Sequence, residues 1–288
     1  MTDAMKDLRV ITAQNPSPLT GRGTNTFLLG RGQIAVIDPG PDLPAHRAAL
    51  LAAAAGGRIS HIFVTHAHLD HSGGARALAR ATGAPILGFG PAESGRSALM
   101  QRLAGDGALA GGEGLDADFV PDIALADGAV VESYEWSLTA LHTPGHFAGH
   151  LGFQRDRAVF CGDVVMGWSS TLISPPDGDL ADYFRTLSRL EALDARTLFP
   201  AHGDPIHTPA ARLAELAAHR RERTAQILSA LRDGPATAEA LARRIYDIPP
   251  ALIPAATRNV LAHLIALSEL GAVQPAGPIA ANALFSVA

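Results

Sequence analysis

The stretch from residue 64 to residue 74, VTHAHLDHSGG, places three histidines and one aspartate within six residues. These four side chains are His66, His68, Asp70 and His71. The β-branched and aromatic run 59–64 that precedes them predicts a buried strand. Because an extended chain points residues i and i+2 to the same side, His66 and His68 can bind one metal ion. We expect the next turn, into a helix that begins near Ser72 as its cap, to direct Asp70 and His71 toward a second ion.

Two coordination spheres need more ligands than this one loop supplies, so the pattern predicts further His or Asp residues at later loops. Such residues follow three other strand-like runs, each near a glycine that permits a tight turn, and they are His146, Asp163 and His202. Imidazole nitrogen and carboxylate oxygen together favour Zn²⁺, and they also suit Mn²⁺ or Fe²⁺. The sequence therefore predicts a metal centre built from loops at the ends of four strands.

The composition limits the classes of protein to be considered. With 288 residues, of which 47% are hydrophobic, the chain can bury a large core, and we expect one large domain plus a smaller one. The net charge of −5 argues against a strongly basic nucleic-acid protein. The first residues lack the apolar core of a signal peptide, and no apolar run approaches the roughly 20 residues of a membrane span. Together with the single cysteine, Cys161, these features predict a cytoplasmic protein outside the membrane.

The order of strand-like and helix-like segments predicts an α+β fold. Residues 1–207 contain two runs of strands with helical segments between and after them, which predicts an αββα sandwich with its metal loops at one edge. Residues 208–288 contain predicted helices and a short strand, and we expect a smaller helical, winged-helix-like domain there. The glycine-rich segment 89–118 is interpreted as an irregular surface insertion, either mobile or bordering the active site. Residues 123–132 are predicted to form one strand.

The ligand pattern resembles that of the metallo-β-lactamase-fold hydrolases. Further matching pieces lie around the ligands, and they are Thr24-Asn-Thr26, Asp38-Pro-Gly40, HTPGHFAGH at 142–150 and Phe199-Pro-Ala-His-Gly203. With the helical tail, these pieces are similar to one branch of the family. That branch includes beta-lactamase-like protein 2, an endoribonuclease, together with bacterial relatives and some thioesterases.

The resemblance implies a role for each of the seven ligand-type residues. His66, His68 and His146 would hold one metal ion. Asp70, His71 and His202 would hold the other, and Asp163 would bridge the two. Such a pair of ions would share a bridging hydroxide that attacks the substrate, with Asp70 as the catalytic carboxylate that orients the water and takes its proton. Asp38 and His150 are expected behind the ligands, where His150 would donate a hydrogen bond to a metal-bound carboxylate.

The substrate stays open, because single-stranded RNA and a small ester or thioester both suit this chemistry. A dense basic cluster, formed by Arg220, Arg221 and Arg223, is either a solvated helix face or a contact for RNA phosphates. The alternative class of function is a nucleic-acid-binding or scaffold protein with a residual metal site, and a homodimer is compatible with either. Since all seven ligands precede residue 208, we expect loss of the tail to impair substrate handling more than metal content.

Overall fold

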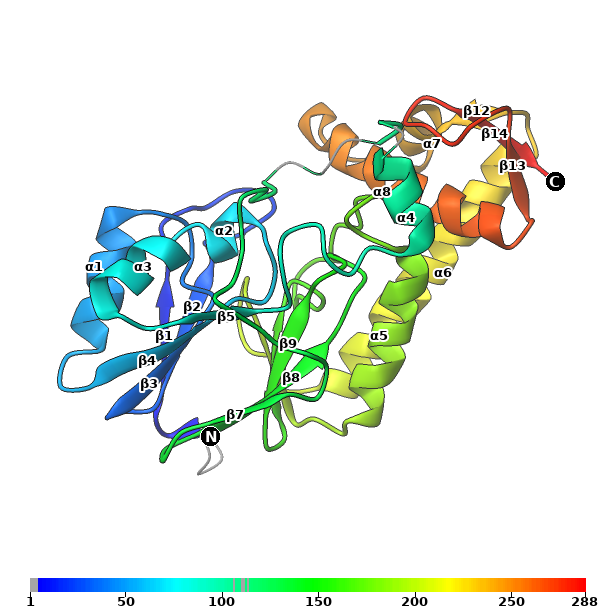
Figure 1. The fold of residues 1–288 in the computed structure, drawn as a ribbon. Helices are drawn as coiled ribbons and strands as arrows, with labels where there is room; N and C mark the ends of the chain where they lie inside the picture. The colour runs from blue at the N-terminus through cyan, green and yellow to red at the C-terminus, as the bar shows by residue number, and fades with distance from the viewer. Residues whose placement is uncertain (1–4, 106, 110–111, 113) are drawn as a thin grey trace.

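Two β-sheets stack face to face, and helices cover both outer faces, in the computed structural model of the chain (Figure 1). The structure describes residues 5–105, 107–109, 112 and 114–288. The first sheet has the order β1 (Leu8–Thr12), β2 (Asn25–Leu29), β3 (Gln33–Ile37), β4 (Arg58–Phe63), β5 (Ile86–Gly88) and β6 (Ile123–Ala124). The second has the order β11 (Thr197–Pro200), β10 (Ala158–Gly162), β9 (Leu151–Arg155), β8 (Ser137–His142) and β7 (Val130–Glu132). The predicted αββα sandwich is confirmed.

Alternating side chains along the strands fill both the space between the sheets and the space under the helices. In β3, Ala35 and Ile37 belong to the core between the sheets, whereas Ile34 and Val36 belong to the core on the helix side. The helices on that side are α1 (Pro44–Ala53) and α3 (Ala75–Thr82). Strands that are buried on both faces need apolar residues at every position, which is why these strands read as continuous hydrophobic runs.

The long helix α6 (Pro209–Leu231) joins the sandwich to the C-terminal residues. Its first half places Leu213 and Leu216 in the same core as Leu187 of α5 (Leu180–Ala192), the helix on the outer face of the second sheet. Its second half places Ile227 and Leu231 in a separate C-terminal core. The boundary at 207/208 stays a prediction, because this one helix contributes to both cores.

A smaller domain follows α6. It contains β12 (Ala236–Thr237), α7 (Ala238–Ile245), the 3₁₀ helix η2 (Pro250–Leu252), α8 (Ile253–Glu269), β13 (Val273–Pro275) and β14 (Leu284–Val287). The strands form an antiparallel sheet in the order β12-β14-β13. Helices packed on such a small sheet have the arrangement of a winged helix, as predicted.

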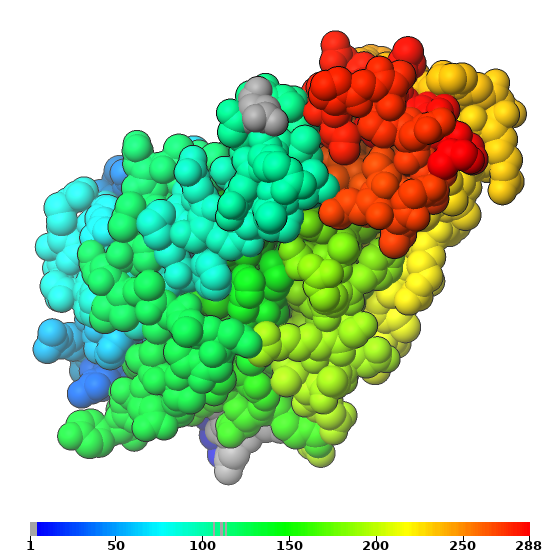
Figure 2. Space-filling model, turned by 45° about the vertical axis from the view of Figure 1, so that its right-hand side comes forward, coloured from blue at the N-terminus to red at the C-terminus, as the bar shows by residue number. Residues whose placement is uncertain are grey.

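The segment 89–118 contains a helix that the sequence interpretation misses, α4 (Ala98–Gly105). Met100 and Leu103 of α4 are buried in the C-terminal core, so this insertion ties the sandwich to the smaller domain (Figure 2). The glycines on both sides of ALMQRLAG conceal the helical spacing of its apolar residues. Within the segment, residues 106, 110, 111 and 113 lie outside the part of the chain that the structure describes.

Two local predictions are wrong. Ser72 does not cap a helix: it ends the short helix α2 (Leu69–Ser72), its hydroxyl group hydrogen-bonds Asp116 Oδ2 at 2.6 Å, and α3 begins only after a pair of glycines. Residues 123–132 do not form one strand, because a turn with positive φ at Gly128 separates β6 from β7. The chain passes from the first sheet to the second at this turn.

One helical stretch of the described residues, Pro250–Glu269, is long and apolar enough for a membrane span by length and composition, with a mean hydropathy of 1.3. Its apolar residues do not form an uninterrupted run, because Arg258, Asn259 and His263 lie among them. Half of the stretch is buried inside the protein, at 50%, and α8 packs against α7 in the C-terminal core. Such packing is typical of the core helix of a folded domain.

Replacing Leu103 by alanine should lower the free energy of unfolding by about 2–5 kcal/mol, because the change removes buried methyl groups and leaves a cavity between α4 and the C-terminal core. Arg102→Ala, on the exposed side of α4, is the matched control and should change it by less than about 0.5 kcal/mol. Urea denaturation followed by circular dichroism measures both. Equal losses in the two variants would contradict the packing of α4.

Candidate metal centre

All seven predicted ligands meet at one edge of the sandwich. The elements that carry them are the loop after β4 for His66 and His68, α2 for Asp70 and His71, and the loops after β8, β10 and β11 for His146, Asp163 and His202. In three overlapping groups, the possible ligand atoms lie within 4.8 Å of one another. The groups are His66–His68–His146, His66–His71–Asp163 and Asp70–His71–His202. Loops that are far apart in sequence are thus brought to one point by the ends of their strands.

The first part of the cluster consists of three imidazole rings. His66 Nε2 lies 2.9 Å from His68 Nδ1, and His146 Nε2 lies 3.2 Å from the same atom. Burial lowers the pKa of His68 to about 3, with His146 adding to the shift. Burial also holds the pKa of His66 well below its usual value. Three neutral imidazoles whose nitrogens converge offer lone pairs to one cation.

The second part of the cluster combines imidazole with carboxylate. His202 Nε2 lies 3.3 Å from Asp70 Oδ2 and 3.3 Å from Asp163 Oδ1, and His71 Nε2 lies 3.5 Å from Asp70 Oδ2 and from Asp163 Oδ2. Asp163 Oδ2 also lies 3.9 Å from His146 Nε2, in the first part. Asp163 therefore faces both parts of the cluster.

Opposing effects set the protonation of His71 and His202. Burial alone would lower their pKa values, but the surrounding carboxylates outweigh it. Asp163 and Asp70 raise the pKa of His202 to about 10, and the pKa of His71 is raised well above its usual value. The carboxylates thus draw positive charge to this part of the cluster, either as protons on the imidazoles or as divalent cations that replace them.

The outer ring nitrogen of three of these histidines contacts a fixed acceptor. His71 Nδ1 lies 2.9 Å from Asp38 Oδ2, His146 Nδ1 lies 2.6 Å from Leu172 O, and His202 Nδ1 lies 3.2 Å from Gly23 O. A carboxylate or carbonyl oxygen can only accept, so each Nδ1 carries a proton and donates. The Nε2 atoms then point their lone pairs or second protons into the cluster, as metal-ligating histidines do.

Two buried polar atoms of the cluster have no hydrogen-bond partner among the described residues: His71 Nε2 and Asp163 Oδ1. A buried polar atom without a partner lowers stability, and most native structures contain few of them. Both atoms face the volume shared by the two parts of the cluster. The donor set and these two atoms fit divalent metal ions bound at this point.

Asp38 lies behind the cluster and connects two of its segments. Its Oδ1 accepts from the Thr65 amide at 2.8 Å, and its Oδ2 accepts from the Thr65 hydroxyl group at 2.8 Å as well as from His71. Asp38 itself has a φ of 51°, a left-handed conformation that Asp and Asn adopt more readily than other side chains. The Asp38-Pro-Gly turn thereby aims a fully buried carboxylate at the ligand loop.

His150 contacts the backbone of Asp163 rather than a carboxylate. The Asp163 amide donates to His150 Nε2 at 3.3 Å, so the ring proton is on Nδ1, which donates to Thr143 Oγ1 at 2.8 Å. The expected hydrogen bond to a ligand carboxylate is absent from the described contacts of His150. The reason is the turn at Gly162 (φ 49°), where an added Cβ would lie 2.4 Å from His150 Nε2. The imidazole lies under this turn and supports it.

Thr24 and Asn25 have roles at the site that the sequence does not predict, since they enter the sequence analysis only as part of the Thr24-Asn-Thr26 motif. The Thr24 hydroxyl group donates to Asp70 Oδ2 at 3.2 Å. Asn25 donates through Nδ2 to Gly203 O at 2.8 Å, and its amide donates to Ala201 O at 2.7 Å, on either side of His202. The available signal is the pair of polar residues at the start of an otherwise apolar strand.

A cavity of about 420 Å³ opens above the cluster. The ligands His68, Asp70, His146, Asp163 and His202 line its floor. Its walls come from residues 17–20, Gly114, residues 166–172 and, on the C-terminal side, residues 246–259. Among the residues that the structure describes, no Lys or Arg lines it.

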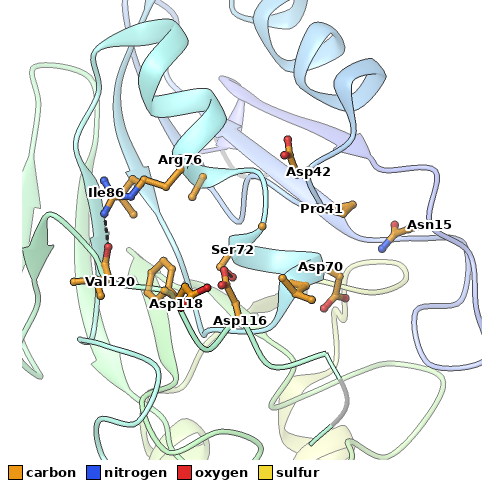
Figure 3. Close-up of a pocket in the computed structure, with 14 residues that line it drawn as sticks. Asn15, Pro41, Asp42, Asp70, Ser72, Arg76, Ile86, Asp116, Asp118 and Val120 are labelled. Carbon is orange, nitrogen blue, oxygen red and sulfur yellow. Dashed lines mark hydrogen bonds between the residues drawn. The ribbon is translucent and has the colours of Figure 1, made fainter.

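A second pocket, of about 610 Å³, lies beside α2 and the start of α3 (Figure 3). Of the seven predicted ligands, only Asp70 lines it. Ser72 and Asp116 hydrogen-bond each other there, and Arg76 donates to Val120 O. The metal centre therefore opens to the first cavity, which five of the seven ligands line.

Comparison with known proteins identifies the class. Residues 19–202 match the model of the metallo-beta-lactamase superfamily, and residues 237–278 match that of the beta-lactamase associated winged helix domain. The chain belongs to the metallo-beta-lactamase superfamily, whose members bind metal ions at sites of this kind, and it is a hydrolase. The winged-helix prediction for the C-terminal residues is confirmed.

Individual members of the superfamily are similar to this chain over most of its length. The chain is 30% identical over 272 residues to a beta-lactamase-like protein 2 homolog of Caenorhabditis elegans, covering 92% of this chain and 85% of that protein. It is 30% identical over 227 residues to an atrochrysone carboxyl ACP thioesterase of Aspergillus fumigatus, covering 76% of this chain but only 63% of the fungal protein. A crystal structure of a metallo-beta-lactamase family protein from Thermus thermophilus superimposes with a TM-score of 0.79 at 28% identity, covering 98% of this chain and 99% of that one.

Replacing Asp38 by asparagine should weaken metal binding by about 10–100-fold, the usual cost of losing a partner of a ligating histidine. Asparagine tolerates the same positive φ, but it is uncharged and has one acceptor oxygen where Asp38 has two. Its NH₂ group would therefore face either the Thr65 amide or the donors on His71 Nδ1 and the Thr65 hydroxyl group. Asp42→Asn, on the exposed end of the same turn, is the control and should bind metal like the parent. Competition with a chromophoric chelator measures the affinity. A parent-like affinity in Asp38→Asn would contradict the role of Asp38.

Proposed function

We propose that this chain is a two-metal hydrolase of small esters or thioesters, with His66, His68 and His146 at one ion, Asp70, His71 and His202 at the other, and Asp163 between them. The observation that carries the proposal is the position of this cluster on the floor of a cavity whose described walls have no cationic side chain. We favour Zn²⁺ as the ion for these nitrogen and oxygen donors. We also propose that the protein is cytoplasmic.

When bound, two such ions supply Lewis acidity and a hydroxide nucleophile at neutral pH. The residues of the chain supply position and proton handling. Asp70 is the more exposed of the two ligand carboxylates, with 28% of its side chain accessible against 11% for Asp163. Thr24 holds Asp70 Oδ2 in place, so the carboxylate can orient an attacking water and take its proton. Asp70 is thus the catalytic carboxylate of the proposal.

The walls of the cavity suit an apolar acyl group. Leu19, Met166 and Trp168 line one side, and Tyr246, Ile248 and Leu252 line the C-terminal side. Burial of apolar surface contributes about 25 cal/mol per Å² to binding, and these six side chains offer such surface directly beside the ligands. A substrate with an apolar acyl chain or ring could place its carbonyl group over the cluster while its apolar part contacts these walls.

The same walls disfavour RNA as a substrate. Phosphodiester backbones are bound mainly by Lys and Arg, which neutralise phosphates. The basic cluster of the tail does not serve this purpose: Arg220 is buried, Arg223 stacks on Tyr246 at 3.8 Å from the ring centroid, and Arg221 stacks on Phe184 at 5.6 Å. A scaffold role is disfavoured because the ligand set contains both carboxylates and all five histidines.

The test is a turnover screen of the metal-loaded full chain against acyl thioesters of increasing chain length, with single-stranded RNA beside them. We expect thioester hydrolysis that chelator abolishes and metal restores. A buried methylene group contributes about 0.8 kcal/mol, so kcat/KM should rise by roughly fourfold per methylene until the cavity is filled. Asp70→Ala should lower kcat by about 10²–10⁴-fold, whereas Asp42→Ala should not.

Two outcomes would contradict the proposal. RNA cleavage without any ester or thioester turnover would place the chain among nucleases. Bound metal without turnover of any substrate in the panel would favour the scaffold role.

A further inference from the structure

Arg220 of α6 is a buried cation without an anionic partner. Its side chain is 1% exposed, and the burial lowers the pKa of its guanidinium group. In the part of the chain that the structure describes, no carboxylate forms an ion pair with it. Its contacts are Thr171 O, Asn259 Oδ1 at 3.1 Å and the face of Tyr183 at 5.5 Å from the ring centroid. An unpaired buried charge lowers stability unless neutral partners compensate it, so a sequence that keeps one here calls for an explanation.

The partners of Arg220 belong to one short segment. Thr171 O accepts from Arg220, and the amide of Ile173 donates to Asn259 Oδ1 at 3.0 Å. Asn259 belongs to α8, and its Oδ1 accepts from Arg220 as well. Arg220 and Asn259 therefore hold the chain on both sides of Leu172.

Leu172 and Thr171 in turn contact a predicted metal ligand. Leu172 O lies 2.6 Å from His146 Nδ1, and Thr171 Oγ1 lies 3.0 Å from the same atom. These contacts set which nitrogen of His146 carries the proton, and so direct Nε2 into the cluster. A displacement of Leu172 would rotate or release this imidazole.

A second arginine of α6 holds the same segment nearer to its start. Arg212 donates through Nε to Met166 O at 2.8 Å and through Nη2 to Ser169 O at 2.7 Å. The segment begins just after Asp163 and ends at the contacts with His146. Helix α6 thus holds the backbone segment that follows Asp163 in the chain and contacts His146 at its other end.

We propose that Arg220 and Asn259 are positioning residues for His146, and that the C-terminal helices are therefore part of the metal centre rather than an appendage to it. The inference rests on the ligand set of the proposed function. It runs against the expectation that loss of the tail impairs substrate handling more than metal content. The buried charge is explained by the need for a donor with fixed, planar geometry that reaches both a carbonyl group and an amide oxygen.

The test compares Arg220→Met with Arg221→Met in the full-length protein. Arg221 is the next residue of α6, is exposed and stacks on Phe184, so the same chemical change there leaves the 171–173 segment untouched. Metal affinity is measured by competition with a chromophoric chelator, and the absorption spectrum of the Co²⁺-loaded protein reports the coordination. We expect Arg220→Met to bind about 10–100-fold more weakly, with an altered Co²⁺ spectrum, and Arg221→Met to match the parent.

Asn259 supplies an independent pair of variants. Asn259→Asp keeps an oxygen acceptor for both Ile173 and Arg220 and should retain the parent affinity and spectrum. Asn259→Leu removes the acceptor and should behave like Arg220→Met. This pair keeps the proposal testable if Arg220→Met does not fold, because it leaves the arginine in place.

Lower melting temperatures with unchanged affinity and Co²⁺ spectrum in Arg220→Met and Asn259→Leu would overturn the proposal and leave the two residues a structural role only. His146→Ala distinguishes this failure from failure of the proposed function. If His146→Ala binds metal like the parent, the ligand set itself is wrong. If it binds more weakly while Arg220→Met does not, only the positioning role is wrong.

Discussion

The structure depends on the attraction between two carboxylates, the half-buried Asp70 and the buried Asp163, and the positive charge gathered around them. Neighbouring imidazolium groups outweigh burial and lower the pKa values of Asp70 and Asp163, so both are ionised at the edge of the sandwich. Beside them, His66 and His68 stay neutral with their nitrogens 2.9 Å apart. The part with Asp70 and Asp163 carries negative charge that attracts cations, and the part with His66 and His68 offers the lone pairs of neutral imidazoles. Two divalent ions satisfy both requirements at once, which is why we interpret the cluster as one centre and not as scattered core histidines.

The supports of this cluster come from every layer of the molecule. Asp38 follows a strand of the first sheet, Gly23 precedes another, and Leu172 lies in a segment held by α6 and α8. Each support fixes an imidazole through its outer nitrogen. The C-terminal residues from α6 onward have two roles in this arrangement, because residues 246–259 line the cavity while Arg220 and Asn259 hold the segment beside His146. A domain that both shapes the cavity and braces a ligand links substrate binding to the metal centre through a few side chains.

The fold and the ligand positions can be predicted because their signals are local. Strands that are buried on both faces read as apolar runs, and each ligand lies within a few residues of such a run, next to a glycine. Helix α4 escapes prediction because glycines flank it and because its two buried residues, Met100 and Leu103, pack mainly with residues more than 100 positions further along the chain. Its stability comes from tertiary packing, which a short window of sequence does not report.

Arg220 shows a different limit. In the sequence it belongs with Arg221 and Arg223 to one basic cluster, although it lies on the apolar stripe of α6 with Leu213, Leu216 and Ile227. That spacing is the available signal, and it predicts burial. The identity of its partners is not predictable, since Thr171 and Asn259 approach from other elements. The C-terminal part of the cavity wall, residues 246–259, could not be predicted for the same reason.

The most direct measurement is the number of metal ions bound per folded chain, determined by equilibrium dialysis with elemental analysis and repeated on Asp163→Ala. We expect about two divalent ions for the parent, the content of a binuclear hydrolytic site, and fewer for the variant that lacks the residue between the two parts of the cluster. A parent chain that folds but binds only one ion, or none, would contradict it.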